Sequence, residues 1–98
     1  MKESKIEERL NIGVESLGGI SYKFVSPMNP GVPDRIVILP GGKIFFVEVK
    51  TEMGKLARIQ KWQLDRLAKA GCEIRVVKGL KEVDDFIEEV SEHAVHSA

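Results

Sequence analysis

The sequence predicts an α/β fold in which a mixed β-sheet is flanked by helices. Three observations lead to this prediction. Apolar residues recur at helical spacing near both ends of the chain. Three short apolar segments bounded by turn residues lie between positions 20 and 50, and a fourth follows a second helical segment. The expected order is therefore helix, three strands, helix, strand and helix.

Each element has its own signal. We expect a helix at about 3–17, strands at about 20–25, 34–39 and 43–50, a helix at about 56–70, a strand at 72–78 and a helix at about 80–91. In the first helix, apolar residues share one face and two glycines follow. A rigid, proline-rich loop at 26–33 separates the first two strands. The turn at 40–42 should join the next two in a hairpin.

The second half of the chain should cross over the sheet. A polar loop at 51–55 precedes the second helix, which ends at Gly71. The strand that follows a helical crossover should lie parallel to a neighbour, which makes the sheet mixed. The last helix is amphipathic, with its apolar side formed by Val83, Phe86, Ile87 and Val90.

Length and composition favour one globular domain over residues 1–98. Apolar residues make up 43% of the chain, which is too many for a disordered tail. The one cysteine, Cys72, cannot form an internal disulfide and is expected to be buried and inert. The apolar runs are far shorter than the roughly 20 residues of a membrane span, and the charged N-terminus does not resemble a signal peptide. We therefore expect a cytoplasmic protein without a membrane partner.

The formal net charge is zero, but the charges are unevenly distributed. Residues 43–81 carry ten basic and four acidic side chains, and residues 82–98 carry six acidic and no Lys or Arg side chains. A basic segment beside an acidic helix fits a phosphate-binding surface. Charge alone is equally compatible with ordinary solvated helix faces.

Two acidic residues and a lysine form the pattern that indicates chemistry. Asp34 follows a proline, and Glu48 comes fourteen residues later, two residues before Lys50. Residues 48 and 50 share one face of a strand because side chains alternate. With a three-residue turn at 40–42, Asp34 lies opposite Glu48, with Cβ atoms roughly 5 Å apart. Two carboxylates at that distance repel, and a divalent cation with oxygen ligands resolves the conflict.

Two alternatives remain open for this pattern. A two-residue turn would shift the register by one and send Asp34 to the other face, unless a bulge corrects it. Lys50 could also form only an ion pair with Asp34 or Glu48 at the end of the sheet. Both faces of the strand begin apolar, so charges at its end need partners or a function.

Two further polar side chains fall on inward helical faces. Gln60 shares a stripe with Leu56, Leu64 and Leu67, where an amide needs a partner. That partner could be the carboxylate pair, or Gln60 could cap a backbone group. Glu3 lies on the inward stripe of the first helix, with Glu7 at its border. Glu3 could complete the outer shell of a metal site, or the first turn could extend beyond the core and leave it in water.

The same residues carry a resemblance to a known family. Pro33-Asp34 followed by Glu48-Val49-Lys50 is a PD-(D/E)xK signature, which is weak alone. The longer pattern resembles the VRR-NUC nucleases over about residues 3–78. It consists of Tyr22-Lys23-Phe24-Val25-Ser26-Pro27, Gly31-Val32-Pro33-Asp34, Phe46-Val47-Glu48-Val49-Lys50 and Gln60. The chain looks like a stand-alone, minimal form of that domain, encoded by a phage or a bacterium.

This resemblance implies a restriction-endonuclease-like αβββαβ core with a C-terminal helix and a magnesium-dependent active site, in which manganese can substitute. It implies metal ligands at Asp34, Glu48 and the carbonyl of Val49. It implies catalytic roles for Lys50 and Gln60, with Glu3 as the first-helix acid. The activity implied is that of an endonuclease that cuts branched DNA, such as four-way (Holliday) junctions, as a homodimer. An inactive DNA-binding module and a hydrolase acting on RNA or nucleotides are the alternatives.

Several cations could position DNA through its phosphates. The candidates are Lys23, Arg35, Lys55, Arg58 and Lys61. Lys55 and Arg58 lie where the catalytic strand leads into the second helix, and a helix N-terminus favours a phosphate. Each candidate could equally be an ordinary solvated charge. The sequence contains no motif for reading bases, so recognition by shape is expected.

Trp62 lies opposite the apolar stripe of the second helix, on its expected outer face. An exposed tryptophan often marks an interface. The interface could join two copies of the chain or stack on DNA, or a loop or the last helix could cover the ring. His93 and His96 lie in the polar tail, where we expect no function.

Overall fold

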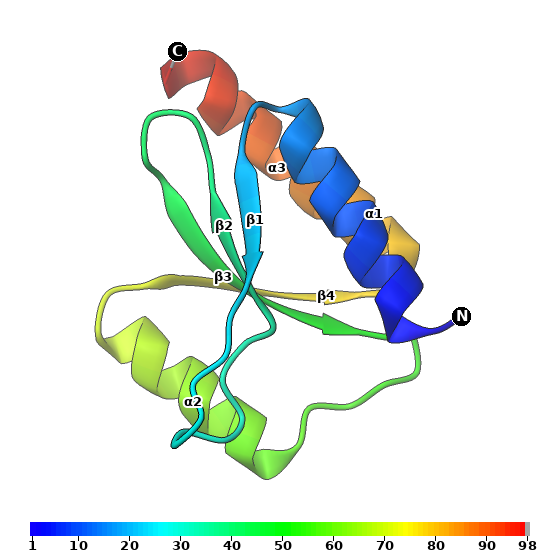
Figure 1. The fold of residues 1–98 in the computed structure, drawn as a ribbon, viewed down its shortest axis with the longest axis vertical. Coiled ribbons are helices and arrows are strands. Elements are labelled where there is room, and N and C mark those ends of the chain that lie inside the picture. The colour runs from blue at the N-terminus through cyan, green and yellow to red at the C-terminus, as the bar shows by residue number, and fades with distance from the viewer. Residues whose placement is uncertain (98) are drawn as a thin grey trace.

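The computed structural model describes the backbone of residues 1–97 and the side chains of residues 1–92. Its elements, in order, are α1 (Glu3–Ser16), β1 (Ile20–Lys23), β2 (Arg35–Ile38), β3 (Ile44–Lys50), α2 (Arg58–Lys69), β4 (Glu73–Lys78) and α3 (Gly79–Ser97) (Figure 1). This order confirms the prediction. The last helix continues to Ser97, beyond the expected end, and the side chains of His93 and His96 lie outside the described residues.

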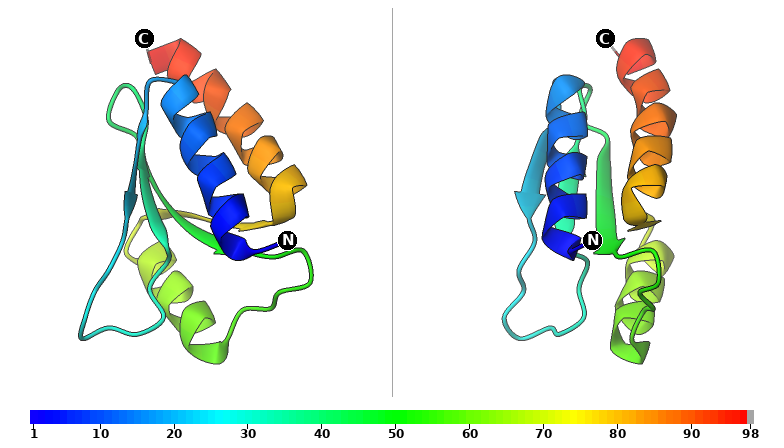
Figure 2. Two further views of the ribbon diagram at one scale, coloured as in Figure 1. Left: turned by 45° about the vertical axis from the view of Figure 1, so that its right-hand side comes forward. Right: turned by 90° about the vertical axis from the view of Figure 1, so that its right-hand side faces the viewer.

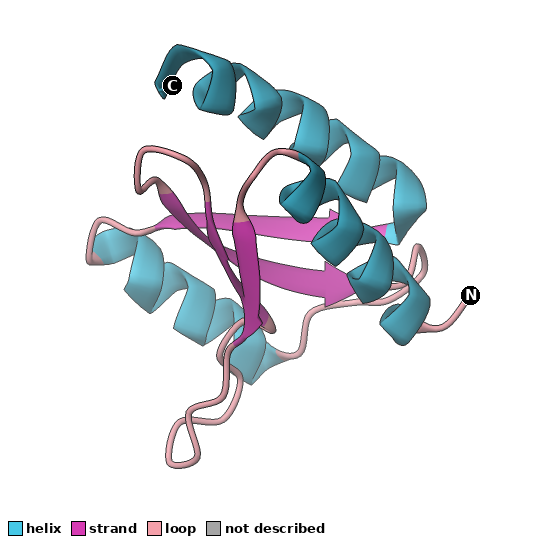
Figure 3. Cartoon of the chain, turned by 45° about the horizontal axis from the view of Figure 1, so that its top comes forward, coloured by secondary structure: helices cyan, strands magenta, loops and turns pink. Residues whose placement is uncertain are grey.

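The sheet is mixed, with strand order β1-β2-β3-β4. The pairs β1–β2 and β2–β3 are antiparallel, whereas β3 and β4 are parallel. Figure 3 shows the arrowheads of β3 and β4 side by side, pointing in the same direction. The helix α2 makes the crossover between these two parallel strands, as a parallel connection requires. Within residues 1–97, no helix is both long and apolar enough to cross a bilayer.

The register of the β2–β3 hairpin decides where the acidic residues lie. The N–H of Leu39 donates to the carbonyl of Lys43 at 2.8 Å, so the turn contains three residues, as expected. Two of them, Gly41 and Gly42, have φ of 92° and 86°, which favours glycine. Arg35 pairs with Val47 in this register, and one further step brings Asp34 opposite Glu48.

One face of the sheet packs against α1 and α3, which lie side by side (Figure 2). The hydrophobic core on this face consists of Ile6, Leu10, Val14, Val37, Leu39, Phe45, Val47, Val49, Val77, Val83, Phe86 and Val90. The odd-numbered residues of β3 point into this core, so its even-numbered residues point to the opposite face. Glu48 and Lys50 therefore lie on the face that α2 approaches. Cys72, just before β4, is half-buried rather than buried.

Candidate functional site

Glu48 and Asp34 meet at the end of the hairpin as a pair of carboxyl groups, one buried and one half-buried. Glu48 is only 2% exposed, and Asp34 is half-buried. Burial is the largest cause of a raised pKa at Glu48 and the charge of Asp34 is the next, and against a lowering by the ammonium of Lys50 the pKa reaches about 7. Near neutral pH the negative charge of ionised Glu48 is therefore not fully compensated by the groups of the protein itself.

The backbone N–H of Val49 orients Asp34, and the backbone carbonyl of Val49 remains available as an acceptor on the same side. The N–H of Val49 donates to Oδ2 of Asp34 at 2.8 Å. Two further steps along the register place Pro33 opposite Val49, and proline has no N–H to donate to the Val49 carbonyl. In an antiparallel ladder the N–H and carbonyl of one residue face the same neighbouring strand. The Val49 carbonyl therefore points to the side on which Asp34 lies.

Lys50 and Gln60 both contact the same oxygen of Glu48. Nζ of Lys50, whose side chain is 13% exposed, lies 3.6 Å from Oε2 of Glu48. Nε2 of Gln60 donates to that oxygen at 3.0 Å, while Oε1 of Gln60 accepts from the N–H of Ala57 at 2.8 Å. Gln60 thus combines the two expected roles, since it caps the start of α2 and reaches the carboxylate pair.

The first helix contains two candidate acids, Glu3 and Glu7, and they lie in different surroundings. Glu7 forms an ion pair with Arg35 at 3.0 Å between Oε1 and Nη1. Glu3 is exposed, as in the alternative in which the first turn extends beyond the core. Its negative charge nevertheless adds a small part to the raised pKa of Glu48, less than burial and Asp34 do. Of the two acids, Glu3 is the one that acts electrostatically on the site.

Arg35 differs from the expectation that it contacts phosphate. Its side chain is 11% exposed and lies on the face of the sheet that α1 covers. Besides Glu7, it donates to the hydroxyl and the carbonyl of Ser21 at 3.1 and 3.0 Å. These contacts tie β2 to β1 and α1, and they leave the guanidinium turned away from the carboxylate pair. Arg35 therefore has a structural role here.

The other four cations proposed for phosphate binding are exposed. Lys55, Arg58 and Lys61 lie around the start of α2, close in sequence to Gln60, and Lys23 ends β1. Because Gln60 touches Glu48, the exposed start of α2 lies beside the carboxylate pair. Three of the four cations therefore lie around the start of the helix that contacts the carboxylate pair.

Gln63 is a positioning residue that the sequence reasoning missed. It is 6% exposed, and its Nε2 donates to the carbonyl of Pro30 at 3.1 Å. Gly31, with φ of 87°, lets the loop approach α2 so closely that a Cβ there would lie 2.8 Å from the carbonyl of Ile59. These contacts hold the loop that leads to Asp34 against α2. The available signal was the position of Gln63 beside the inward stripe, three residues after Gln60.

The donor set fits a hard divalent cation. Among the described side chains, no three His, Cys, Asp or Glu residues lie together. The site offers instead two carboxylates and a backbone carbonyl that its strand partner cannot satisfy. Mg²⁺ in proteins is often held by one or two carboxylates and keeps several waters. Ionising Glu48 is unfavourable in the protein alone, as its raised pKa shows, and a bound cation would offset that unfavourable energy.

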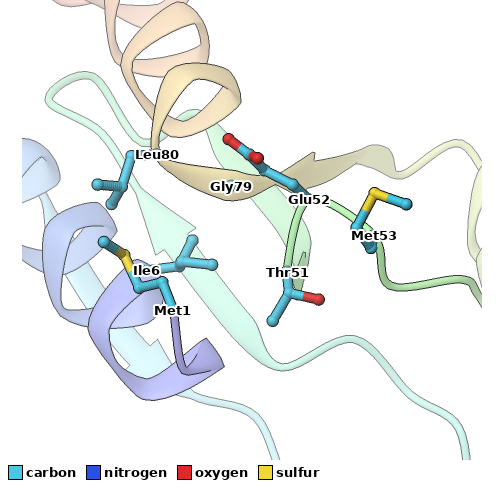
Figure 4. Close-up of a pocket in the computed structure, with 7 residues that line it drawn as sticks. All are labelled: Met1, Ile6, Thr51, Glu52, Met53, Gly79 and Leu80. Carbon is cyan, nitrogen blue, oxygen red and sulfur yellow. The ribbon is translucent and has the colours of Figure 1, made fainter.

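A cavity of about 510 Å³ opens beyond the end of β3 (Figure 4). It is lined by Met1, Ile6, Thr51, Glu52, Met53, Gly79 and Leu80. Asp34, Glu48, Lys50 and Gln60 are absent from this lining. The cavity begins at Thr51, the residue after Lys50, and the carboxylate pair itself does not line it.

Residues 4–81 match the family model of the VRR-NUC domain. The chain belongs to the VRR-NUC family. It is 46% identical over 77 residues to "Putative nuclease p44" of Acyrthosiphon pisum secondary endosymbiont phage 1, an alignment that covers 79% of this chain and 83% of the phage protein. A solved structure of a VRR-NUC domain superposes with a TM-score of 0.81 at 35% identity, covering 88% of this chain and 94% of that one.

These similarities confirm the restriction-endonuclease-like α/β fold and the membership of a nuclease family that the sequence predicted. The family and the phage relative indicate that this VRR-NUC chain is a nuclease.

The raised pKa of Glu48 predicts that the metal-free protein becomes less stable as the pH rises from 5 to 8. The folded-state pKa of about 7 exceeds the ordinary value of 4.5, so the stabilisation is complete below about 4.5 and is lost as the pH rises through 7. The free energy of unfolding should fall by roughly 3 kcal/mol, at about 1.4 kcal/mol per pKa unit. Urea unfolding in EDTA at several pH values measures this.

Glu48→Gln is the matched control, because it keeps the shape and the hydrogen-bonding capacity without the titration. The variant should lack this part of the pH dependence. Identical pH profiles for the two proteins would show that Glu48 titrates normally.

Proposed function

We propose that this chain is a metal-dependent endonuclease that hydrolyses phosphodiester bonds of branched DNA, such as four-way junctions. The observation that carries the proposal is the convergence of a buried carboxylate pair, an acceptor carbonyl and the amine of Lys50 at one end of β3. Residues 1–98 would act as one domain. A 46% identical phage relative supports a phage- or bacterium-encoded enzyme, and we propose that it works in the cytoplasm.

Asp34, Glu48 and the carbonyl of Val49 would hold Mg²⁺, with Mn²⁺ as a substitute. All three donors are oxygens, which suits both ions. When bound, the ion would supply positive charge to the scissile phosphate and lower the pKa of a water molecule. The hydrogen bond from the N–H of Val49 holds the Asp34 carboxylate in the orientation that this role needs.

Lys50 would act on the reacting phosphate. Its ammonium group is largely buried and lies 3.6 Å from Glu48, so its position is defined. From there it can orient the attacking water or offset negative charge that develops on the phosphate oxygens. Gln60 would keep the Glu48 carboxylate aimed at the ion, since it bonds to Oε2. Glu3 would add negative charge at the edge of the site.

The substrate would be placed by contacts to its phosphates. Lys55, Arg58 and Lys61 surround the start of α2, whose N-terminal N–H groups also favour an anion. Lys23 would contact a second segment of the backbone. Such contacts position DNA without reading its sequence, so recognition would depend on the shape of the branch.

An inactive DNA-binding module is the second reading of the same fold. A binding module needs surface cations, but it gains nothing from a buried carboxylate pair. The burial and raised pKa of Glu48 cost stability, and such a cost is typical of active sites. The structure therefore favours an enzyme over a module that only binds.

Replacing Asp34, Glu48 or Lys50 by Ala should abolish cleavage while much DNA binding remains. Loss of the Lys50 amine removes charge stabilisation from the transition state, which typically costs about 10²–10³ in rate. The measurement is cleavage of a labelled four-way junction, compared with linear duplex of equal sequence, in Mg²⁺ and in EDTA. Lys5→Ala, which removes an exposed lysine of α1, is the matched control and should cleave normally.

Cleavage by Asp34→Ala at the wild-type rate in Mg²⁺ would disprove this mechanism. Binding that survives EDTA, with no nicked product under any metal, would favour the inactive module. RNA of equal sequence is included as a third substrate, and its preferred cleavage over both DNA substrates would place the chain among the RNA hydrolases.

We also propose that two copies pair through the part of the sheet that α2 leaves uncovered. The register aligns Ile20, Ile38 and Ile44 in one row across three strands, beside a second row of Tyr22, Ile36, Phe46 and Ile74. Ile20, Tyr22 and Ile44 are 45, 60 and 46% exposed. An uncharged face of this kind can pair with itself about a two-fold axis. Two-fold symmetry would also suit cutting two strands of a junction.

Ile44→Lys should convert the dimer to a monomer, because pairing would bury two like charges against apolar side chains. Size-exclusion chromatography with light scattering measures the mass directly. Ile12→Lys introduces the same charge at an isoleucine of α1 that is 61% exposed, and it should leave the dimer intact. A monomeric wild-type protein at high micromolar concentration would refute this surface as a dimer interface.

A further inference from the structure

The outer face of α2 presents three cations around one aromatic ring. Arg58, Trp62, Arg66 and Lys69 follow one another at spacings of four, four and three residues, so they form a single stripe. This stripe lies opposite Gln60 and Leu64, which point toward the sheet. All four side chains are exposed, and Trp62 is 51% exposed. We call this set the α2 stripe.

The ring of Trp62 is held at the surface by its own helix. The guanidinium carbon of Arg66 lies 4.7 Å from the centre of the ring, which is a cation–π contact. The exposure of Trp62 rules out the alternative that a loop or the last helix covers it. Two occupants of the α2 stripe therefore remain from the sequence, a second copy of the chain and DNA.

Charge decides between these two occupants. A two-fold interface through the α2 stripe would bring Arg58, Arg66 and Lys69 close to their own copies, and like charges in an interface are costly. Only Asp65 on this side of the helix would offset them. A nucleic acid offers the opposite charge in its phosphates and a flat apolar face in each base. The uncharged sheet face, by contrast, can meet its own copy without this penalty.

We propose that the α2 stripe binds DNA at an unpaired base, which stacks on Trp62 while neighbouring phosphates contact Arg58, Arg66 and Lys69. This rests on the proposed function, and it names the feature of the substrate that α2 recognises. Gln60 and Trp62 lie on opposite sides of one helix, about 10 Å apart given the diameter of a helix. DNA cut beside Gln60 can therefore reach the stripe by passing around α2.

Stacking on a tryptophan requires an open base face. A continuous duplex covers both faces of each base, whereas a gap, a flap or an open branch exposes one. Stacking of one base on an aromatic side chain typically contributes about 1–3 kcal/mol and is tolerant of sequence. The α2 stripe would thus favour DNA with unpaired bases over continuous duplex, without a preference for a particular sequence.

Trp62 is the one tryptophan of the chain, so its fluorescence reports on this contact directly. The experiment titrates the wild-type protein in EDTA, which prevents cutting, with three DNAs. These are a single strand, a duplex with a one-nucleotide gap and the continuous duplex of the same sequence. We expect the first two to quench the emission strongly and the continuous duplex to change it little.

The variants separate stacking from charge. Trp62→Ala should weaken binding to the gapped duplex about 5- to 150-fold, which is the stacking energy converted at about 1.4 kcal/mol per tenfold. Because the Trp62 variants contain no tryptophan, affinities are compared by the fluorescence anisotropy of labelled DNA. Trp62→Phe should retain most of the affinity. Both should bind continuous duplex within about twofold of the wild type, because the phosphate contacts remain. Ile12→Ala removes another exposed apolar side chain from a helix and should change neither affinity.

If the emission of Trp62 does not change with DNA but shifts with protein concentration, Trp62 lies in a contact between copies and the proposal is overturned. Equal losses of affinity by Trp62→Ala on gapped and continuous duplex would also overturn it. If the wild type cleaves DNA in Mg²⁺ but its emission is unaffected by any of the three DNAs, the stacking inference fails while the nuclease proposal stands. Quenching by gapped DNA without cleavage would support stacking and reject the nuclease proposal.

Discussion

The alignment of Asp34 with Glu48 is the constraint on which the rest of the site depends. It is set by the length of the turn at 40–42, because a change of one residue would send Asp34 to the opposite face of the sheet. The same register places Pro33 opposite Val49 and so withholds a donor from the carbonyl of Val49. The length of a three-residue turn thus determines the positions of three oxygen donors that lie several residues away from it.

The contacts around this pair hold charges in place that the fold alone would not favour. Burial of Glu48 raises its pKa to about 7, so ionising it at neutral pH costs stability in the absence of a cation. Gln60 ties the carboxylate to the start of α2, and Gln63 ties α2 to the loop before Asp34. The carboxylate pair is therefore electrostatically unfavourable, and contacts with neighbouring elements keep its geometry fixed, as in other preorganised sites.

Periodicity could predict the fold and most of the site, because both follow from spacing along the chain. The turn length predicted the facing acids, and the helical stripe predicted that Gln60 points inward. The role of Arg35 could not be predicted in this way. Its ion pair with Glu7 joins residues 28 positions apart and depends on how α1 packs on the sheet. The exposure of Glu3 could not be predicted either, since no pattern in the sequence shows whether a first turn extends beyond the core.

The most direct test of the account is isothermal titration calorimetry of Mn²⁺ into the wild-type protein and into Asp34→Asn, in buffers of different ionisation enthalpy. The account predicts that the wild type binds Mn²⁺ and that binding near pH 6 releases close to one proton, because Glu48 must ionise. At pH 8 this release should be much smaller, and Asp34→Asn should bind far more weakly. No uptake of Mn²⁺ by the wild type, or equal uptake by the variant, would contradict the claim that these two carboxylates share a cation.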